Sequence, residues 1–245
     1  MSLHKLLMAG ASVSLMLIGA AAWSQQACAG AAYNPAADFE TGFTTQSNPN
    51  GVWSYGYSSN FTTPVTLYDQ TAQPGINGPN AQYWITPSVN IGESPSAEFN
   101  NGPAYDDGNV HFAANQFLLV AGIGPYYSDL VFTAAVAGSY SVVSSFLGDQ
   151  YGIGTVVGVL VNDVVLFNSS VTAVGQTVPF DTEVSLTAGE TVEFSVGPGS
   201  GLQNTGLNLT ITDLSSPSSI PEPASLALLA TGLLGIMSSR LRKRA

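Results

Sequence analysis

The class of fold is indicated most clearly by one stretch, Thr191-Val192-Glu193-Phe194-Ser195-Val196. Its apolar residues Val192, Phe194 and Val196 share one face of an extended chain, and the polar residues between them share the other. This period of two is typical of a β-strand that has one face in a core.

Further runs rich in branched and aromatic residues extend this pattern, and Gly, Asn, Asp and Pro separate them. Asn162-Asp163 divides two runs at hairpin spacing, and Ala188-Gly189-Glu190 predicts a second turn. No stretch between the tails has sustained helical periodicity. The sequence therefore predicts an all-β fold, a single β-sandwich of the jelly-roll kind over residues 30–214. The other predicted strands are 130–135, 140–147, 156–161, 164–167, 177–180, 183–186 and 207–212.

The part before Leu130 is rich in Gly, Asn, Pro and aromatic residues, as in the stretch 48–57. Two interpretations are open: edge strands with long loops, or a first sheet whose pattern is masked. We expect Trp53 and Trp84 to lie in the core, although aromatic rings on such a fold also serve as stacking platforms for sugars.

All five basic residues lie in the two tails, where each group flanks an apolar run. This arrangement is typical of targeting segments at both ends of an exported chain. The residues are Lys5 at the front and the membrane-stop cluster Arg240, Arg242, Lys243 and Arg244 at the back.

Residues 1–29 have the pattern of a secretory signal peptide. The apolar core covers 6–22, and small residues suited to cleavage lie at Ala27-Cys28-Ala29. In a lipoprotein Cys28 would carry the lipid, but the preceding Gln25 and Gln26 disfavour that alternative. Cleavage after Ala29 removes the only cysteine. The exported body would then have no disulfide, thiolate metal site or cysteine nucleophile.

The back tail has a linker at residues 215–220, the motif Pro221-Glu222-Pro223, an apolar run at 224–239 and the basic cluster. As a helix the run spans about 24 Å, somewhat less than a bilayer core of about 30 Å, and the basic side chains can snorkel. A buried C-terminal helix is the alternative. The run is apolar on all sides, which favours a transmembrane helix with its basic end in the cytoplasm.

This order of elements resembles the PEP-CTERM sorting signal of bacterial exported proteins, here over residues 221–245. The resemblance implies recognition by an exosortase, a membrane transpeptidase that cuts near the motif and releases or re-attaches the body at the cell surface. Pro221, Glu222 and Pro223 would be sorting residues. The C-terminal helix would anchor the chain in the membrane only transiently.

The body also resembles, over residues 48–212, a recurrent ectodomain type of PEP-CTERM proteins. The likeness is carried by the entry at 48–57, the Gly138–Val142 strand, the hairpin at Val159–Asp163 and the ending Thr205–Leu207. That type is similar to the jelly rolls of carbohydrate-binding modules. Its members carry Asp after the closing Gly-Leu, whereas this chain has Asn208, which weakens a metal role there.

The charge of the body excludes several classes of partner. From Asp38 to Asp213 there are acidic residues but no Lys or Arg. Nucleic acid is excluded because phosphate contacts come largely from basic side chains, and anionic surfaces are disfavoured for the same reason. Neutral glycans and divalent cations are still possible ligands. The simpler interpretation is that the negative charge serves only solubility.

We predict no catalytic residue. His111 would be the only imidazole after signal removal, and no nucleophile motif accompanies it. A carboxylate pair in a glycan-active enzyme is the alternative, because glycoside hydrolysis needs only two acids. The candidate acids are Glu93, Glu98, Asp106 and Asp107.

Two binding sites are predicted. Tyr126 and Tyr127 follow Gly124-Pro125 and are candidates for stacking on a glycan, unless their rings are core. A Ca²⁺ ion, the one cofactor considered, would bind Asp38, Glu40 and Asp213 if Asp38-Phe39-Glu40 is extended and meets the end of the closing strand. Ordinary surface acids are the alternative. The sequence thus predicts an exported structural or glycan-associated matrix protein whose partners are an exosortase and a neutral polysaccharide.

Overall fold

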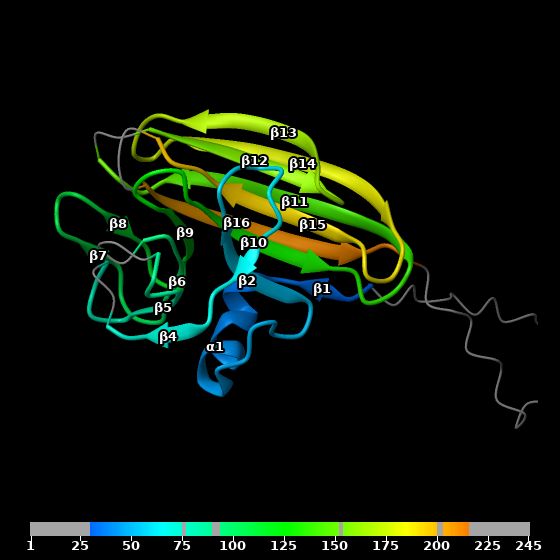
Figure 1. Ribbon diagram of the computed structural model, residues 1–245, viewed down its shortest axis with the longest axis horizontal. Helices are drawn as coiled ribbons and strands as arrows, with labels where there is room; N and C mark the ends of the chain where they lie inside the picture. Colours follow the sequence, from blue (N-terminus) through cyan, green and yellow to red (C-terminus); the bar gives the residue numbers. More distant parts are fainter. Residues whose placement is uncertain (1–29, 75–76, 90–93, 152–153, 200–202, 216–245) are drawn as a thin grey trace, which may run out of the picture.

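The computed structural model describes residues 30–74, 77–89, 94–151, 154–199 and 203–215. They form a sandwich of an eight-stranded and a six-stranded sheet, and every strand pair is antiparallel (Figure 1). The prediction of an all-β sandwich is confirmed.

Eight consecutive strands form a jelly roll. In the eight-stranded sheet they lie in the order β14-β11-β16-β9, and in the six-stranded sheet in the order β13-β12-β15-β10. Apart from the β12–β13 pair, which stays in the six-stranded sheet, successive strands cross from one sheet to the other, as in two interlocked Greek keys. Their bounds are β9 (Phe117–Ala121), β10 (Tyr127–Thr133), β11 (Gly138–Gly148), β12 (Thr155–Val161), β13 (Val164–Val171), β14 (Thr177–Leu186), β15 (Thr191–Val196) and β16 (Gln203–Asp213).

The predicted strands after residue 130 are all present, with one correction. The runs 177–180 and 183–186 are a single strand, β14, because Asp181 and Thr182 continue the alternation between exposed and half-buried side chains. The hairpin between β12 and β13 is confirmed. Asn162 and Asp163 have φ values of 50° and 63°, which is the left-handed conformation that a tight hairpin turn needs.

The part before β9 extends both sheets. Strands β2 (Trp53–Ser58) and β3 (Thr66–Leu67) continue the six-stranded sheet beyond β10, while β6 (Ser96–Asn100), β5 (Ala81–Ile85) and β4 (Gln70–Ala72) continue the other beyond β9. A separate hairpin consists of β7 (Tyr105–Asp106) and β8 (His111–Phe112). This segment is therefore not a separate first sheet: its strands extend one side of both sheets, and β3 and β4 form the edges there.

One helix, α1 (Pro35–Thr45), follows β1 (Ala32–Tyr33), so the expectation of an extended segment at Asp38-Phe39-Glu40 was wrong. The Oδ1 atom of Asn34 accepts the backbone N–H groups of Ala36 (2.9 Å) and Ala37 (3.1 Å), and Pro35 has the φ that a first turn requires. Phe39 lies on the buried face of the helix.

Aromatic rings fill the core between the sheets. The Phe39 ring lies 5.3 Å from that of Tyr55 and 5.8 Å from that of Phe117 between ring centroids, so the helix is anchored in the same core as the strands. Trp53 and Trp84 are buried, as predicted. Burial of these rings stabilises the fold because it removes a large apolar area from water.

Among the residues that the structure describes, no helix is long and apolar enough to span a membrane. The predicted signal peptide (1–29), the transmembrane run (224–239), the sorting and basic residues from Pro221 to Arg244, and the candidate acid Glu93 lie outside the described residues.

Candidate functional site

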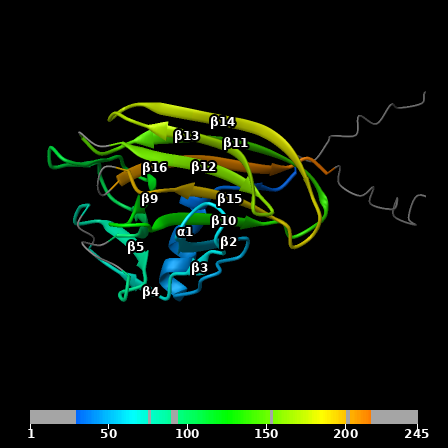
Figure 2. The same ribbon diagram turned by 45° about the horizontal axis from the view of Figure 1, so that its top comes forward.

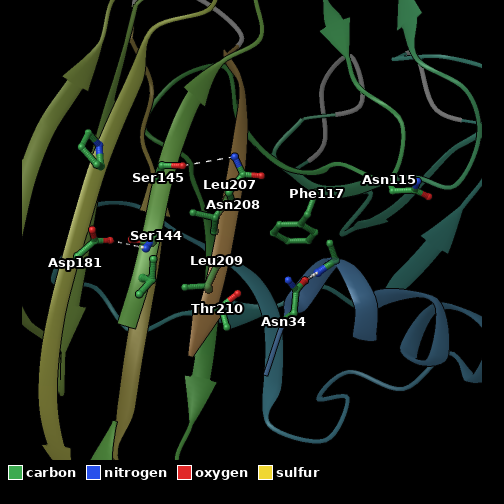
Figure 3. Close-up of a pocket in the computed structure, with 13 residues that line it drawn as sticks. Asn34, Asn115, Phe117, Ser144, Ser145, Asp181, Leu207, Asn208, Leu209 and Thr210 are labelled. Carbon is green, nitrogen blue, oxygen red and sulfur yellow. Dashed lines mark hydrogen bonds between the residues drawn. The ribbon is translucent and has the colours of Figure 1, made fainter. Parts of the chain in front are cut away.

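A groove lies beside β16, at the point where the strand that pairs with β16 changes from β9 to β1. Strand β16 pairs with β9 as far as Gly206, and with β1 at Ile211 and Thr212. The stretch 207–210 has no strand pairing on that edge among the described residues, and α1 begins beside it. The resulting groove has a volume of about 460 Å³ (Figure 3). This is within the range of about 300 to 1,000 Å³ that is usual for ligand sites.

The strand register gathers polar side chains along one wall of the groove. Ser145 lies opposite Pro179 on one side and Asn208 on the other, and Val143 lies between Asp181 and Thr210 in the same way. These residues share the outer face of the sheet because each lies two positions from the next along its strand. Asn34, Ala36 and Asn115 line the opposite side, and Phe117, Leu207 and Leu209 are buried beneath (Figure 3).

Only some of the hydrogen-bonding groups on this wall are paired within the protein. The Ser144 backbone N–H donates to Oδ1 of Asp181 (3.2 Å), and the Asn208 amide donates to the Ser145 hydroxyl at 3.5 Å. The side chains of Asn115 and Thr210 have no hydrogen-bond partner among the described residues. Amide, hydroxyl and carboxylate groups are therefore free to bind a ligand.

The groove is weakly acidic. Asp181 is the only ionisable side chain among the described residues that line it, and this part of the chain contains no Lys or Arg. Val143 is 53% exposed and adds an apolar patch next to Pro179. Such a wall suits a neutral ligand that carries both hydroxyl groups and apolar C–H faces, and it does not suit an anion.

The predicted stacking residues lie elsewhere. Tyr126 and Tyr127 are half-buried at the start of β10 and are outside the groove. The Tyr126 ring meets Tyr57 at a centroid distance of 5.9 Å, and the Tyr127 ring meets Phe61 at 4.9 Å, both in T-shaped contacts. Partial burial raises the pKa of Tyr127. Part of each ring therefore packs within the protein.

The structure does not bring Asp38, Glu40 and Asp213 together. Oδ2 of Asp38 accepts the indole N–H of Trp53 at 2.9 Å, Oδ1 of Asp213 accepts the Ser215 backbone N–H at 2.7 Å, and Glu40 is exposed on α1. Across the described ranges, no group of three or more His, Cys, Asp or Glu residues is placed to hold a metal ion.

The described candidate catalytic acids lie in different surroundings. Glu98 is buried and accepts hydrogen bonds from Asn77 (2.8 Å) and from the Ser96 hydroxyl (2.7 Å). Asp106 lies in the β7–β8 hairpin, 3.3 Å from Nδ1 of His111, and both side chains are nearly half exposed. Asp107 caps the same hairpin turn, where backbone N–H groups lower the pKa of its carboxyl.

Three buried acids were not anticipated from the sequence. One is Asp149, which accepts a hydrogen bond from the Gln116 amide at 2.7 Å and whose pKa is raised by burial to about 8; the other two are Asp129 and Glu193. Asp129 and Glu193 point away from the core on β10 and β15, yet both are buried. The Ser195 hydroxyl donates to Asp129. The Phe61 ring, in the loop between β2 and β3, lies against Gly158, the residue opposite Ser195. Burial raises the pKa of Asp129 to about 7; burial and the charge of Asp129 raise the pKa of Glu193 to about 8. Alternation alone assigns Glu193 to the face away from the core and does not indicate that it is buried.

Residues 219–243 match the model of the PEP-CTERM protein-sorting motif. The chain carries this motif. The prediction from Pro221-Glu222-Pro223, the apolar run and the basic end is thereby confirmed. The PEP-CTERM motif implies an exported, surface-sorted protein that an exosortase processes. No curated protein matches the chain.

Three solved structures show a distant likeness. A family 35 carbohydrate-binding module from Clostridium thermocellum is 15% identical, with 54% of this chain and 87% of that chain covered and a TM-score of 0.27. A family 4 module is 9% identical, with 46% and 89% covered and a TM-score of 0.28. A family 35 module from an environmental isolate is 19% identical, with 49% and 82% covered and a TM-score of 0.26. The likeness concerns the fold alone.

Proposed function

We propose that this chain is a non-catalytic protein of the cell surface that binds a neutral extracellular polysaccharide in the groove beside β16. Residues 1–29 direct its export. The helix at 224–239 anchors it in the membrane until the exosortase acts at the PEP-CTERM motif. The sandwich of residues 30–214, joined to the motif by the linker 215–220, then acts as a structural component of the matrix.

The observation that carries the proposal is the composition of the groove. It combines exposed amides, a hydroxyl and one carboxylate with the apolar surface of Val143 and Pro179, and it has no basic side chain. Sugar hydroxyls hydrogen-bond to such polar groups, and the C–H faces of the sugar ring pack on the apolar ones. An acidic polysaccharide would meet Asp181 without a cation to balance it.

The placement of the carboxylates supports binding rather than hydrolysis. Glu98 is buried and hydrogen-bonded. Asp129 and Glu193 are also buried, and neither lines the groove. Hydrolysis needs two acids on opposite sides of one sugar bond, about 5 to 9.5 Å apart. Of the residues that the structure describes, Asp181 is the only acid that lines the groove.

The test is affinity electrophoresis of the chain through gels that contain neutral or acidic polysaccharides, with reducing-sugar release measured on the same samples. We expect retardation by a neutral polymer only, without sugar release. Asn208→Ala and Asp181→Ala should each weaken binding about tenfold. Ser185→Ala, an exposed change further along β14, is the matched control and should bind normally.

Other outcomes would overturn the placement or the function. If Tyr126→Ala with Tyr127→Ala abolished binding and Asn208→Ala did not, the glycan site would lie at the start of β10. Sugar release above background would establish the alternative, a carboxylate-dependent glycan-active enzyme. Binding unchanged in Asn208→Ala and Asp181→Ala would remove the groove as a site.

A further inference from the structure

One residue in the middle of β16 has its backbone groups facing the groove. Strand β16 keeps a continuous register with β11, so the N–H and C=O groups of successive residues point alternately to the two sides of the strand. The Leu214 N–H donates to Ser139 on the β11 side, and the Asp213 N–H donates to Ala31 on the β1 side. Odd-numbered residues therefore face β1 and β9, and Leu209 is the odd-numbered residue midway between those two pairings.

The chain on both sides of Leu209 turns away from it and leaves what we call the Leu209 gap. Strands β9 and β1 border the same edge of β16 in succession, β9 near its start and β1 near its end (Figure 2). If the β1 register continued, the residue opposite Leu209 would be Pro35, which has no N–H and begins α1. If the β9 register continued, that residue would be Asn115, whose φ of 56° is not extended. Neither neighbour can pair there.

The backbone of Leu209 is therefore available to a ligand. Its N–H and C=O groups have no hydrogen-bond partner on this edge among the described residues. The residue is only 4% exposed, and buried backbone groups are nearly always paired in folded proteins. A ligand that hydrogen-bonds to Leu209 would supply the partner that the sheet does not.

The Leu209 gap has an apolar floor and a polar far side. Phe117 lies between β16 and the chain around Asn115, and its ring is buried (Figure 3). Ala36, in the first turn of α1, lines the same groove with a single methyl group. The Asn115 side chain has no hydrogen-bond partner within the part of the chain that the structure describes. The gap thus suits one short group that carries both hydrogen-bonding atoms and an apolar end.

We propose that the Leu209 gap binds the acetamido group of an N-acetyl amino sugar. This inference rests on the proposed glycan function and narrows the ligand to neutral polysaccharides that contain such sugars. The acetamido oxygen accepts the Leu209 N–H, the acetamido N–H donates to the Asn115 side chain, and the methyl group packs on Phe117. A trans secondary amide directs its N–H and C=O to opposite sides, as this arrangement requires. The sugar ring lies over Asn208 and Val143 on the outer face of the sheet.

Other occupants fit the Leu209 gap less well. A hydroxyl group ends at its oxygen, so it cannot hydrogen-bond to Leu209 and also contact the floor. A free amine would be attracted to Asp181 by charge and would leave the apolar floor unused. A peptide that adds to a sheet edge pairs over a run of residues, whereas this gap extends only over 207–210.

Calorimetric titration of the full chain with two oligosaccharides tests the ligand class. N-acetylchitotetraose and cellotetraose share a β-1,4 backbone and differ at carbon 2 of each ring, which carries an acetamido group or a hydroxyl. The acetylated tetramer should bind at least about tenfold more tightly. In saturation-transfer NMR its acetyl methyl should give the strongest signal.

The outcomes separate this inference from the proposed function. Equal affinity for the two tetramers would overturn the acetamido site and leave a neutral glycan in the groove. The same conclusion would follow if neither tetramer bound while a neutral polysaccharide still retarded the chain in gels. If no neutral polysaccharide retarded the chain, the proposed function itself would be wrong.

Two neighbouring alanines of α1 test the location. Ala36 lines the groove, whereas Ala37 is exposed and outside it. Ala36→Val narrows the Leu209 gap and should reduce the preference for the acetylated tetramer to less than about threefold, while Ala37→Val should keep it. Asn115→Gly is compatible with the positive φ and removes the amide, so it should also reduce the preference. Circular dichroism checks that each variant keeps the sheets. An unchanged preference in both Ala36→Val and Asn115→Gly would show that the acetamido group does not enter the gap.

Discussion

Asp129 and Glu193 are diagonal neighbours on adjacent strands, since Asp129 lies opposite Ser195, two residues from Glu193. Both side chains are buried, and one carboxylate oxygen of each has no hydrogen-bond partner among the described residues. No protein cation is near enough to neutralise them, because the described part of the chain has no Lys or Arg. The raised pKa values of about 7 and about 8 follow from this burial.

The pair predicts that the fold loses stability as pH rises. In the unfolded chain both acids titrate near pH 4, whereas in the folded protein they keep their protons up to about pH 7 to 8. The folded state therefore binds more protons across that window, and the free energy of unfolding falls, by on the order of a few kcal/mol, between about pH 4 and pH 8. Urea unfolding at about pH 5 and about pH 8 measures this difference.

Asp129→Asn assigns the effect to the pair. The amide mimics the protonated acid, so the variant should resemble wild type at about pH 5 and be more stable than wild type at about pH 8. Glu183→Gln removes the same charge from an exposed position on β14 and is the control for net charge. If the two variants flatten the pH dependence equally, general repulsion accounts for it and the buried pair does not.

Two glycines on the outer face of the six-stranded sheet should differ in their response to alanine. A Cβ at Gly56 would lie 2.5 Å from the Thr66 carbonyl oxygen, and one at Gly158 would lie 2.6 Å from the Phe61 ring. Backbone cannot move aside as a side chain can. Gly56→Ala should therefore cost about 1 to 3 kcal/mol in urea unfolding, and Gly158→Ala less.

A double variant separates strain from other effects at Gly158. In a Phe61→Ala background the added methyl group meets no ring, so Gly158→Ala should cost almost nothing there. If the cost of Gly158→Ala were the same with and without the Phe61 ring, the loop would not lie against this face as described.

Alternation predicted the jelly-roll strands because a strand is recognised from a few neighbouring residues. On β15, for example, Val192, Phe194 and Val196 suffice. The helix was missed for a local reason: Asn34 and Pro35 are good start signals, but Thr41, Gly42 and the following threonines are poor helix formers. The groove could not be predicted at all. It depends on β1 and β16 pairing, which brings Asn34 close to Thr210, and no short stretch encodes that register.

Asp38 should act as an anchor for Trp53 rather than as a metal ligand. Asp38→Ala leaves the indole N–H without its acceptor and should lower the free energy of unfolding by about 1 to 3 kcal/mol. Glu40→Ala changes an exposed side chain of the same helix and should have an effect within about 0.5 kcal/mol. Urea unfolding with EDTA or with added Ca²⁺ checks both points. A stabilisation by Ca²⁺ that both variants abolish would restore the calcium site at Asp38, Glu40 and Asp213.

The sorting motif predicts a separate dependence on Glu222, the only acidic residue between Asp213 and the end of the chain. A proline stands on each side of this carboxylate in the sequence, so we expect an exosortase to meet a single negative charge directly before the apolar run. Glu222→Ala in the full chain should reduce release of the body from the membrane fraction about tenfold in cells that have the exosortase. Ser218→Ala, just outside the matched residues, is the control and should be released normally. Because the sandwich ends before this segment, the glycan binding of the retained chain should not change. Equal release of both variants would show that processing depends on the apolar run and the basic cluster and does not require the Glu222 carboxylate.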